Sequence, residues 1–302
     1  MERAAVLIGV KKTGGIPVLQ AVNSSLAHMA KWLRGQGIPK DRLRILSDRR
    51  TPVTASAIKE AVKGFLDLGC IEQLIVYFTG HGTIVGASEF WLLSGAPDNA
   101  DEAVNLDLSV TFARRSKVLH VIFISDACRT PAAGAQAQSI IGSSIFPNFR
   151  PQRSESSVDI FFGSSLGSPS LEVRSSADVG GEFRAVFTDS LVHALRGNVP
   201  SILELGEPAP AKVVRAWPLK DHLMEDVAKR IRDLHLPMQM TQNPDARINS
   251  NPKRWISFLK DGPPVAYAGD GLVAPPPSQS TPVVAAPEPF DVAQVVDSML
   301  VD

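Results

Sequence analysis

The stretch QLIVYFTGHG, from Gln73 to Gly82, joins an apolar run of strand length to a histidine between two glycines. Nearly continuous apolar runs of this length are typical of strands that are buried on both faces of a sheet. Such a strand normally ends in a turn that needs no titratable side chain, so an imidazole at His81 is unexpected. The stretch therefore predicts a buried strand that carries a histidine just beyond its end.

Three further apolar runs of strand length predict buried strands. Two segments with helical periodicity lie between the first of the four runs and the run at Gln73. The runs lie at residues 4–10, 117–127 and 157–165. Residues 18–37 and 54–69 place apolar side chains along one face, and Thr54 is a predicted N-cap. Strands that alternate with helices predict an α/β fold with a mostly parallel central sheet and helices on both faces. In such a sheet, ligands bind beyond the carboxyl ends of the strands.

The composition changes at Gly262, where a proline-rich and acidic segment begins. Residues 262–302 hold eight prolines, five acidic residues and no lysine or arginine. We therefore predict a folded domain over 1–261, an extended linker over 262–289 and a short amphipathic segment over 290–302. The last segment either binds a regulatory partner or the folded domain, or it is a disordered acidic end.

Charge and cysteine content exclude several classes of function. The chain has 31 basic and 31 acidic residues, so we expect no direct binding to nucleic acid or to a membrane surface. The first apolar run is too short for a signal peptide or a membrane span, and we expect a cytoplasmic protein. Cys70 and Cys128 make neither a disulfide framework nor a metal site, and we expect Cys70 to be a packed thiol.

Cys128 follows the third apolar run as His81 follows the second. If these strands are parallel neighbours, both side chains emerge at one edge of the sheet. A thiol needs a nearby imidazole or helix N-terminus to become an effective nucleophile at neutral pH. Attack on an amide carbonyl also needs N–H donors for the oxyanion, and Gly82 and Cys128 are the candidates. Either residue alone is more often structural, but the pair, 47 positions apart, favours a nucleophile and its base.

These motifs carry a family resemblance. YFTGHG at 77–82 and DAC at 126–128 resemble the histidine and cysteine motifs of caspase-like cysteine peptidases of clan CD (peptidase C14), especially metacaspases and bacterial orthocaspases. The resemblance extends over about residues 4–258. It implies a caspase-hemoglobinase fold and cleavage of peptide bonds through an acyl-enzyme on Cys128, with His81 as general base and then acid. It implies no resident cofactor and leaves open whether calcium is required.

The resemblance also implies a pocket for a basic substrate residue, because metacaspases and orthocaspases cleave after Arg or Lys. Asp126 matches the family's acidic residue two positions before the cysteine, although it is alternatively the cap of a following helix. Ser24 stands where the family has a second aspartate, and a pocket with one carboxylate binds a guanidinium more weakly. Glu172 is a candidate for the missing charge. Ser164 and Ser165 are predicted to line the substrate site.

The sequence departs from the family pattern after the cysteine, where Arg129 replaces a histidine. This cation either lowers the pKa of the thiol or is solvated. Residues 130–157 are predicted to form an active-site loop and, by resemblance, to be cleaved after Arg153. By resemblance, too, the peptidase is latent until it is activated in a stress, cell-death or defence pathway. The alternative is a catalytically silent caspase-like scaffold that docks a partner through residues 290–302; another α/β thiol hydrolase is a third interpretation.

Overall fold

The structure is a computed structural model, and it describes five stretches of the chain: residues 1–150, 155–174, 183–207, 210–233 and 241–259. The predicted linker, the amphipathic segment at 290–302 and Arg153 lie outside these stretches. Within them, no helix is long and apolar enough to cross a membrane.

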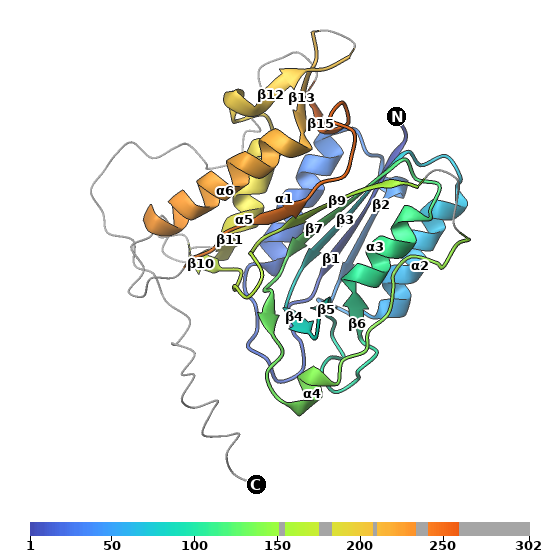
Figure 1. Ribbon diagram of the computed structural model, residues 1–302, viewed down its shortest axis with the longest axis vertical. Coiled ribbons are helices and arrows are strands. Elements are labelled where there is room, and N and C mark those ends of the chain that lie inside the picture. The colour runs from blue at the N-terminus through green and yellow to red at the C-terminus, as the bar shows by residue number, and fades with distance from the viewer. Residues whose placement is uncertain (151–154, 175–182, 208–209, 234–240, 260–302) are drawn as a thin grey trace.

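A six-stranded sheet forms the centre of the fold, in the order β14-β9-β7-β3-β1-β2 (Figure 1). Its strands are β1 (Arg3–Gly9), β2 (Leu43–Ser47), β3 (Gln73–Thr79), β7 (His120–Asp126), β9 (Ser157–Phe162) and β14 (Asp245–Arg247). All neighbours are parallel except β9 and β14. Every residue of β1, β3 and β7 is buried, as their apolar runs predict, and the fourth run forms β9.

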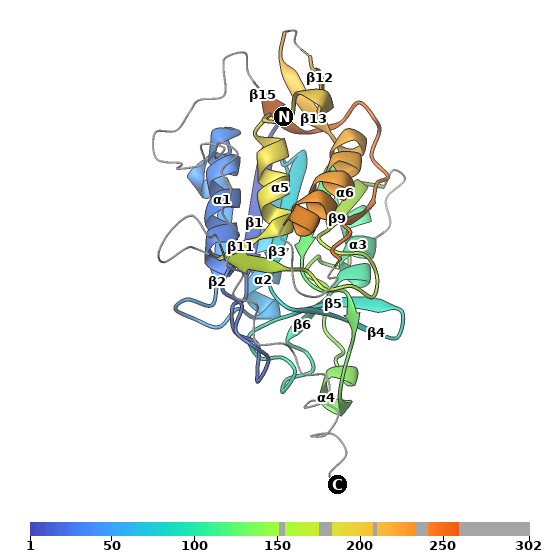
Figure 2. The ribbon, with the colours of Figure 1, turned by 90° about the vertical axis from the view of Figure 1, so that its left-hand side faces the viewer.

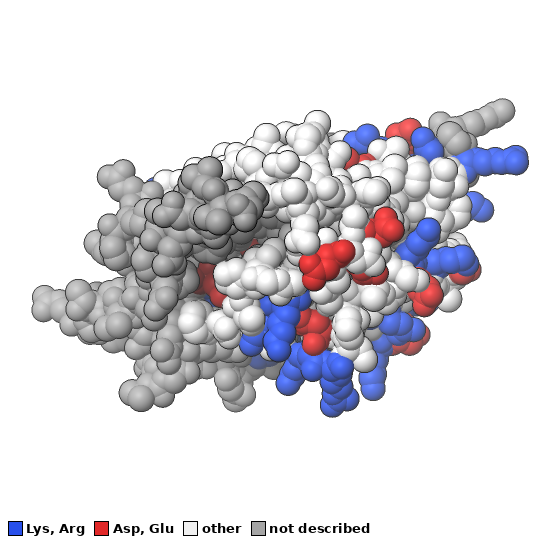
Figure 3. Space-filling model, turned by 90° about the horizontal axis from the view of Figure 1, so that it is seen from below, with Lys and Arg blue, Asp and Glu red and all other residues white. Residues whose placement is uncertain are grey.

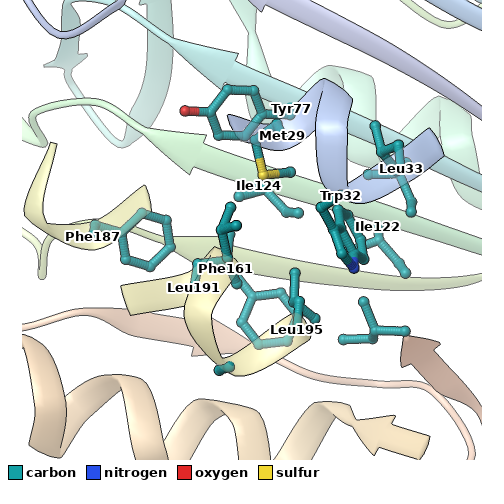
Figure 4. Close-up of a cluster of buried hydrophobic side chains, with 14 of the residues drawn as sticks. Met29, Trp32, Leu33, Tyr77, Ile122, Ile124, Phe161, Phe187, Leu191 and Leu195 are labelled. Carbon is teal, nitrogen blue, oxygen red and sulfur yellow. The ribbon is translucent and has the colours of Figure 1, made fainter. Parts of the chain in front are cut away.

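Helices cover both faces of the sheet, which confirms the predicted layers (Figures 1 and 2). One face packs against α1 (Val22–Gly35), α5 (Val186–Leu195) and α6 (Ala216–Asp233), and the other against α2 (Ala55–Asp67) and α3 (Leu106–Arg114). Figure 4 shows the first interface, where Trp32 and Leu33 of α1 and Leu195 of α5 lie against the sheet. Thr54 caps α2 as predicted, because its side chain accepts a hydrogen bond from the N–H of Ala57.

Smaller elements surround the central sheet. One four-stranded sheet, in the order β6-β5-β4-β8, consists of β4 (Gly82–Val85), β5 (Ser88–Leu92), β6 (Ala103–Asn105) and β8 (Thr130–Pro131). The others are β12 (Leu203–Leu205), β13 (Lys212–Arg215) and β15 (Trp255–Leu259), and the pair β10 (Glu172–Arg174) and β11 (Phe183–Ala185). Short helical turns lie at η1 (Lys40–Arg42), α4 (Ala135–Gln138) and η2 (Pro200–Ile202). Because β4 and β8 follow β3 and β7, they extend the chain beyond the carboxyl edge of the central sheet.

A row of polar side chains crosses the opposite, amino-terminal edge of the sheet. The side chain of Gln73 accepts from Nε of Arg3 at 2.7 Å and donates to Nδ1 of His120, with the two nitrogens 3.2 Å apart. Because Nδ1 accepts, Nε2 of His120 carries the proton, which it donates to Oδ2 of Asp159 at 2.8 Å. The row joins β1, β3, β7 and β9 and so stabilises their register.

Asp159 completes this row in a fully buried position. Its other oxygen accepts from the backbone N–H groups of Asn249 and Ser250, both at 3.0 Å. Burial alone would raise the pKa of Asp159, but the hydrogen bonds from His120 and Ser250 outweigh it and hold the pKa below its usual value. The ionised carboxylate therefore stabilises the folded state.

We expect Asp159→Asn to lower the free energy of unfolding by about 1–3 kcal/mol, because the new amide nitrogen would face the protonated Nε2 of His120. Urea unfolding at neutral pH measures the change. The difference in the free energy of unfolding between the wild type and Asp159→Asn should become smaller as the pH falls below about 4, where Asp159 of the wild-type protein becomes protonated. Asp101→Asn, at an exposed position, is the control and should change stability by less than about 0.5 kcal/mol. Equal stabilities of the two variants would contradict the expectation.

Candidate active site

His81 and Cys128 follow two neighbouring strands at the same distance. β3 and β7 are parallel and pair with a constant offset of 47 residues. The same offset continues beyond the sheet, where Thr83 of β4 pairs with Thr130 of β8. The intervening chains therefore run side by side, and the structure places His81 and Cys128 on neighbouring chains at the carboxyl edge of the sheet. No hydrogen bond joins these two side chains in the described part of the chain.

The imidazole of His81 is held by a backbone carbonyl. Its Nε2 lies 2.8 Å from the carbonyl oxygen of Pro17, in the segment between β1 and α1. A carbonyl oxygen only accepts hydrogen bonds, so Nε2 carries the proton and Nδ1 holds the lone pair. Burial lowers the pKa of His81, against the opposing effects of the Pro17 carbonyl and of the charge on Glu172. The ring is therefore neutral at neutral pH, with Nδ1 available as a base.

The thiol of Cys128 is partly buried and lies against the backbone of Ser170. The N–H of Ser170 donates to Sγ at 3.3 Å, and its carbonyl oxygen lies 3.8 Å from Sγ. Burial raises the pKa of the Cys128 thiol; the N–H of Ser170 acts against this, and the charges of Asp126 and Glu172 raise the pKa further. The thiol is therefore protonated at neutral pH, and its reaction as a nucleophile requires a base.

The backbone N–H of Gly82 points towards the chain that carries Cys128. The N–H of Leu92 in β5 donates to the carbonyl of His81 at 2.9 Å, and antiparallel pairs alternate between bonded and non-bonded positions. The N–H of Gly82 consequently points away from β5, to the side where β8 lies. A Cβ atom at Gly82 would lie 2.5 Å from the carbonyl oxygen of Cys128 and 2.9 Å from Cβ of Ala127. Only glycine fits here, and its role as an oxyanion donor stays a prediction.

We expect Gly82→Ala to lower the free energy of unfolding by about 1–3 kcal/mol, because the added methyl group forces the two chains apart. Gly64→Ala is the matched control, since Gly64 lies in α2, where an added methyl group would meet nothing within 4 Å. The control should instead stabilise the helix by about 0.5–1 kcal/mol. Chemical unfolding of both variants measures the difference, and a stable Gly82→Ala protein would show that the close approach is not a constraint.

The carboxylate of Asp126 is buried at the end of β7, and both of its oxygens accept hydrogen bonds. Oδ1 accepts from the hydroxyl of Ser170 at 2.7 Å, and Oδ2 accepts from the hydroxyl of Thr188 at 2.5 Å. Burial raises the pKa of Asp126 to about 6, in spite of these hydrogen bonds. A helix cap, the alternative for this residue, is wrong, because β8 and not a helix follows Cys128.

The three serines predicted to contact substrate all donate or share hydrogen bonds within the protein. Ser24 of α1 donates to the carbonyl oxygen of Phe183 in β11 at 2.7 Å. Ser164 is fully buried and donates to the carbonyl oxygen of Ala127 at 3.2 Å. Ser165 shares a hydrogen bond with the hydroxyl of Ser168. Ser164 therefore holds the backbone next to Cys128, and substrate contact by any of the three stays a prediction.

Glu172 lies at the start of β10 and binds the beginning of α1. Its carboxylate accepts from the backbone N–H groups of Gln20 and Ala21 at 2.8–2.9 Å. Its charge also raises the pKa values of both His81 and Cys128, which places it near the two candidate residues. The carboxylate thus lies at the site as predicted, but its hydrogen bonds are to the protein backbone.

Four residues of the site were not singled out by the sequence: Pro17, Ser170, Thr188 and Asp189. Asp189 raises the pKa of Asp126 through its charge, so two carboxylates lie near one another on this side of the site. Its oxygens lie 3.3 Å from Nδ1 of His28 and 3.7 Å from Nη1 of Arg184. Thr188 and Asp189 lie in the first turn of α5, and the run FTDSLVHAL at 187–195 is the sequence signal that could have found them.

Arg129 does not point into solvent, so the solvated alternative for it is wrong, and an effect on the pKa of the thiol stays a prediction. It is buried and forms a bidentate ion pair with Glu89, with both distances 2.8 Å. It also donates to Asp245 at 3.1 Å, and its guanidinium lies 3.9 Å from the ring centre of Phe162. Arg129 is therefore a structural anchor for the chain that follows Cys128.

Two further expectations concern the second cysteine and metal binding. Cys70 is exposed, so its expected packing is wrong; α2 ends at Asp67, and the turn that follows faces solvent. Across the stretches that the structure describes, no group of three or more His, Cys, Asp and Glu side chains has the arrangement of a metal site.

The charges around this end of the molecule are mixed. Figure 3 shows the molecule from the end where β4, β5 and α4 lie, and acidic and basic side chains both appear on its described surface. Neither sign predominates on the described part of this face.

The structure is thus an α/β fold in which His81 and Cys128 lie on neighbouring chains at the carboxyl edge of a mostly parallel sheet. The sequence matches the profile of the caspase domain, peptidase C14, over residues 2–250. The chain therefore belongs to the caspase family, and the predicted caspase-type fold is confirmed.

Solved structures agree with this assignment at the level of the fold. Caspase-1 from Spodoptera frugiperda is 13% identical, with a TM-score of 0.51 over 82% of this chain and 86% of that chain. Protein GSU0716 from Geobacter sulfurreducens is also 13% identical, with a TM-score of 0.53 over 86% of this chain and 100% of that chain. No curated protein sequence matches the chain.

Proposed function

We propose that the protein is a cysteine endopeptidase that uses Cys128 as the nucleophile and His81 as the base. The observation that supports this proposal is the register that puts His81 and Cys128 on adjacent chains at one edge of the sheet, together with the hydrogen bond of Nε2 to Pro17 that leaves Nδ1 as the lone-pair nitrogen. Membership of the caspase family supports it, because a peptidase family implies protein substrates.

The reaction follows from the protonation states of the two side chains. Nδ1 of His81 takes the proton from Sγ as the sulfur attacks the carbonyl carbon of the scissile peptide bond. The N–H groups of Gly82 and Cys128 stabilise the oxyanion that forms. The imidazolium then gives its proton to the leaving amine, which leaves an acyl group on Cys128. His81 next removes a proton from water, which attacks this thioester and releases the acid product and the thiol.

A basic P1 residue, the one before the cleaved bond, is the substrate feature that the acidic side chains support. Asp126 has a pKa of about 6 and is therefore ionised at neutral pH. Asp189 lies close enough to act on it, and this second acid compensates for the uncharged Ser24. Arg fits such a site best, because its guanidinium forms bidentate hydrogen bonds with a carboxylate.

The hydrogen bonds of Asp126 also support the proposal that the peptidase is latent. The carboxylate is buried and accepts from the hydroxyls of Ser170 and Thr188, so we expect a substrate to reach it only after a neighbouring side chain has moved. An activating partner that rearranges Ser170 would free one oxygen. We place this activation in a stress, cell-death or defence pathway, with processing after Arg153 and partner binding through residues 290–302 as its proposed means.

A panel of fluorogenic peptides with Arg, Lys or Asp at P1 tests the reaction. We expect cleavage after Arg and Lys, and a fall of at least about 10³-fold in kcat/KM for both Cys128→Ala and His81→Ala. Cys70→Ala is the matched control and should retain activity, since Cys70 is exposed and outside the site. The mass of the active protein, compared with that of Cys128→Ala, reports processing after Arg153. No Cys128-dependent cleavage, with or without candidate activators, would favour the catalytically silent scaffold.

The role of Asp126 predicts a specific pH dependence. We compare substrates with Arg or its uncharged analogue citrulline at P1, so that protonation of His81 affects both equally. The preference for Arg should decline as the pH falls through about 6, because Asp126 becomes protonated there. The Asp126→Asn variant should show only a weak preference for Arg over citrulline at every pH. A preference that does not change between pH 5 and 7 would exclude Asp126 from the pocket.

A further inference from the structure

Glu172 and His81 hold the same short segment of chain from two sides. His81 donates to the carbonyl oxygen of Pro17 at 2.8 Å. Three residues further on, both oxygens of Glu172 accept from the N–H of Gln20 at 2.9 Å, and one also accepts from the N–H of Ala21 at 2.8 Å. Glu172 is distant in sequence, so this contact fixes the end of the segment in the tertiary structure.

The chain between β1 and α1 forms a loop from Lys11 to Ala21, and the start of this loop is also bound by a carboxylate, which lies outside the candidate site. Oδ2 of Asp48 accepts from the N–H groups of Lys11 and Lys12 at 2.8 and 2.7 Å. The N–H of Leu19 donates to the carbonyl of Lys11 at 3.1 Å and closes the loop. Two carboxylates thus hold the loop, and only that of Glu172 acts on the pKa values of His81 and Cys128.

On the basis of the proposed function, in which His81 is the base, we propose that Glu172 is a positioning residue. Glu172 holds the loop so that the Pro17 carbonyl oxygen accepts the hydrogen bond from Nε2 of His81. This hydrogen bond keeps the proton on Nε2 and orients Nδ1 towards the reacting thiol. Without this contact the ring is free to rotate or to change tautomer, and misplacement of a reacting group by about 1 Å lowers the rate by roughly 100-fold.

The charge of Glu172 supports the same role. It raises the pKa of His81, against the effect of burial, and so strengthens the base. It also adds to the raised pKa of Cys128, behind burial and the charge of Asp126, and so disfavours the free thiolate. Glu172 thus acts on both groups through its charge. Removal of the Glu172 charge should therefore lower the pKa of the thiol and weaken the base at the same time.

A pocket role for Glu172, in which it binds the P1 cation, makes a different prediction. A carboxylate that binds substrate determines the preference for Arg over citrulline, whereas a positioning residue changes kcat for both substrates equally. Comparison of the Arg and citrulline substrates therefore distinguishes a positioning role from a pocket role. The reactivity of the Cys128 thiol towards an alkylating reagent gives a second measurement, which does not depend on catalysis.

The test compares Glu172→Gln with Asp48→Asn in the full-length protein. Iodoacetamide alkylation of Cys128 is followed across pH by peptide mass spectrometry, with exposed Cys70 as the internal reference. For Glu172→Gln we expect kcat to fall about ten-fold or more for both substrates. The Arg preference should stay within about two-fold of wild type, and alkylation of Cys128 should extend to lower pH. Asp48→Asn should leave the alkylation profile unchanged.

Glu172→Asp separates position from charge, because it keeps the charge on a shorter side chain. It should keep the wild-type alkylation profile but have a lower kcat. The proposal is overturned by a wild-type kcat in Glu172→Gln, by a loss of Arg preference in that variant, or by an alkylation profile that does not shift. If the wild-type protein cleaves no peptide, with or without candidate activators, while the shift is present, the proposed function fails and the coupling of Glu172 to Cys128 stands.

Discussion

The pairing of β3 with β7 determines where the chemistry of this protein takes place. A parallel pair with a constant offset of 47 residues runs from Gln73 and His120 at one edge to Thr83 and Thr130 beyond the other. A slip of one residue would move both side-chain patterns to the wrong faces. It would also separate His81 from Cys128. The buried polar row at the amino-terminal edge therefore stabilises an arrangement at the opposite end of the same strands.

The protonation states of the site favour one kind of cysteine chemistry. Burial acts on both groups, lowering the pKa of His81 and raising that of Cys128, so the free site holds a neutral imidazole and a neutral thiol. A preformed thiolate–imidazolium pair would need the opposite shifts. In the proposed reaction the proton is therefore transferred as the substrate is attacked, and the resting thiol is protected from oxidation and from electrophiles, which react with thiolates.

The sequence allowed the central strands and the placement of His81 and Cys128 to be predicted, because both follow from local patterns. Continuous apolar runs indicate buried strands, and the residue after each run indicates the edge of the sheet. The contacts of Arg129 could not be predicted in this way, since Glu89 and Asp245 lie 40 and 116 positions away. The same is true of Glu172, whose partners at Gln20 and Ala21 are about 150 residues distant. Long-range pairing of polar groups leaves no periodic signal in one sequence.

The buried ion pair of Arg129 has a consequence for how salt acts on this protein. With the side chains of Arg129 and Glu89 only 4% and 7% exposed, dissolved ions screen their attraction weakly. The chain after Cys128 therefore keeps its place over a wide range of ionic strength. For the proposed peptidase, we therefore expect salt to weaken the encounter with a cationic peptide in solvent more than it weakens this buried ion pair.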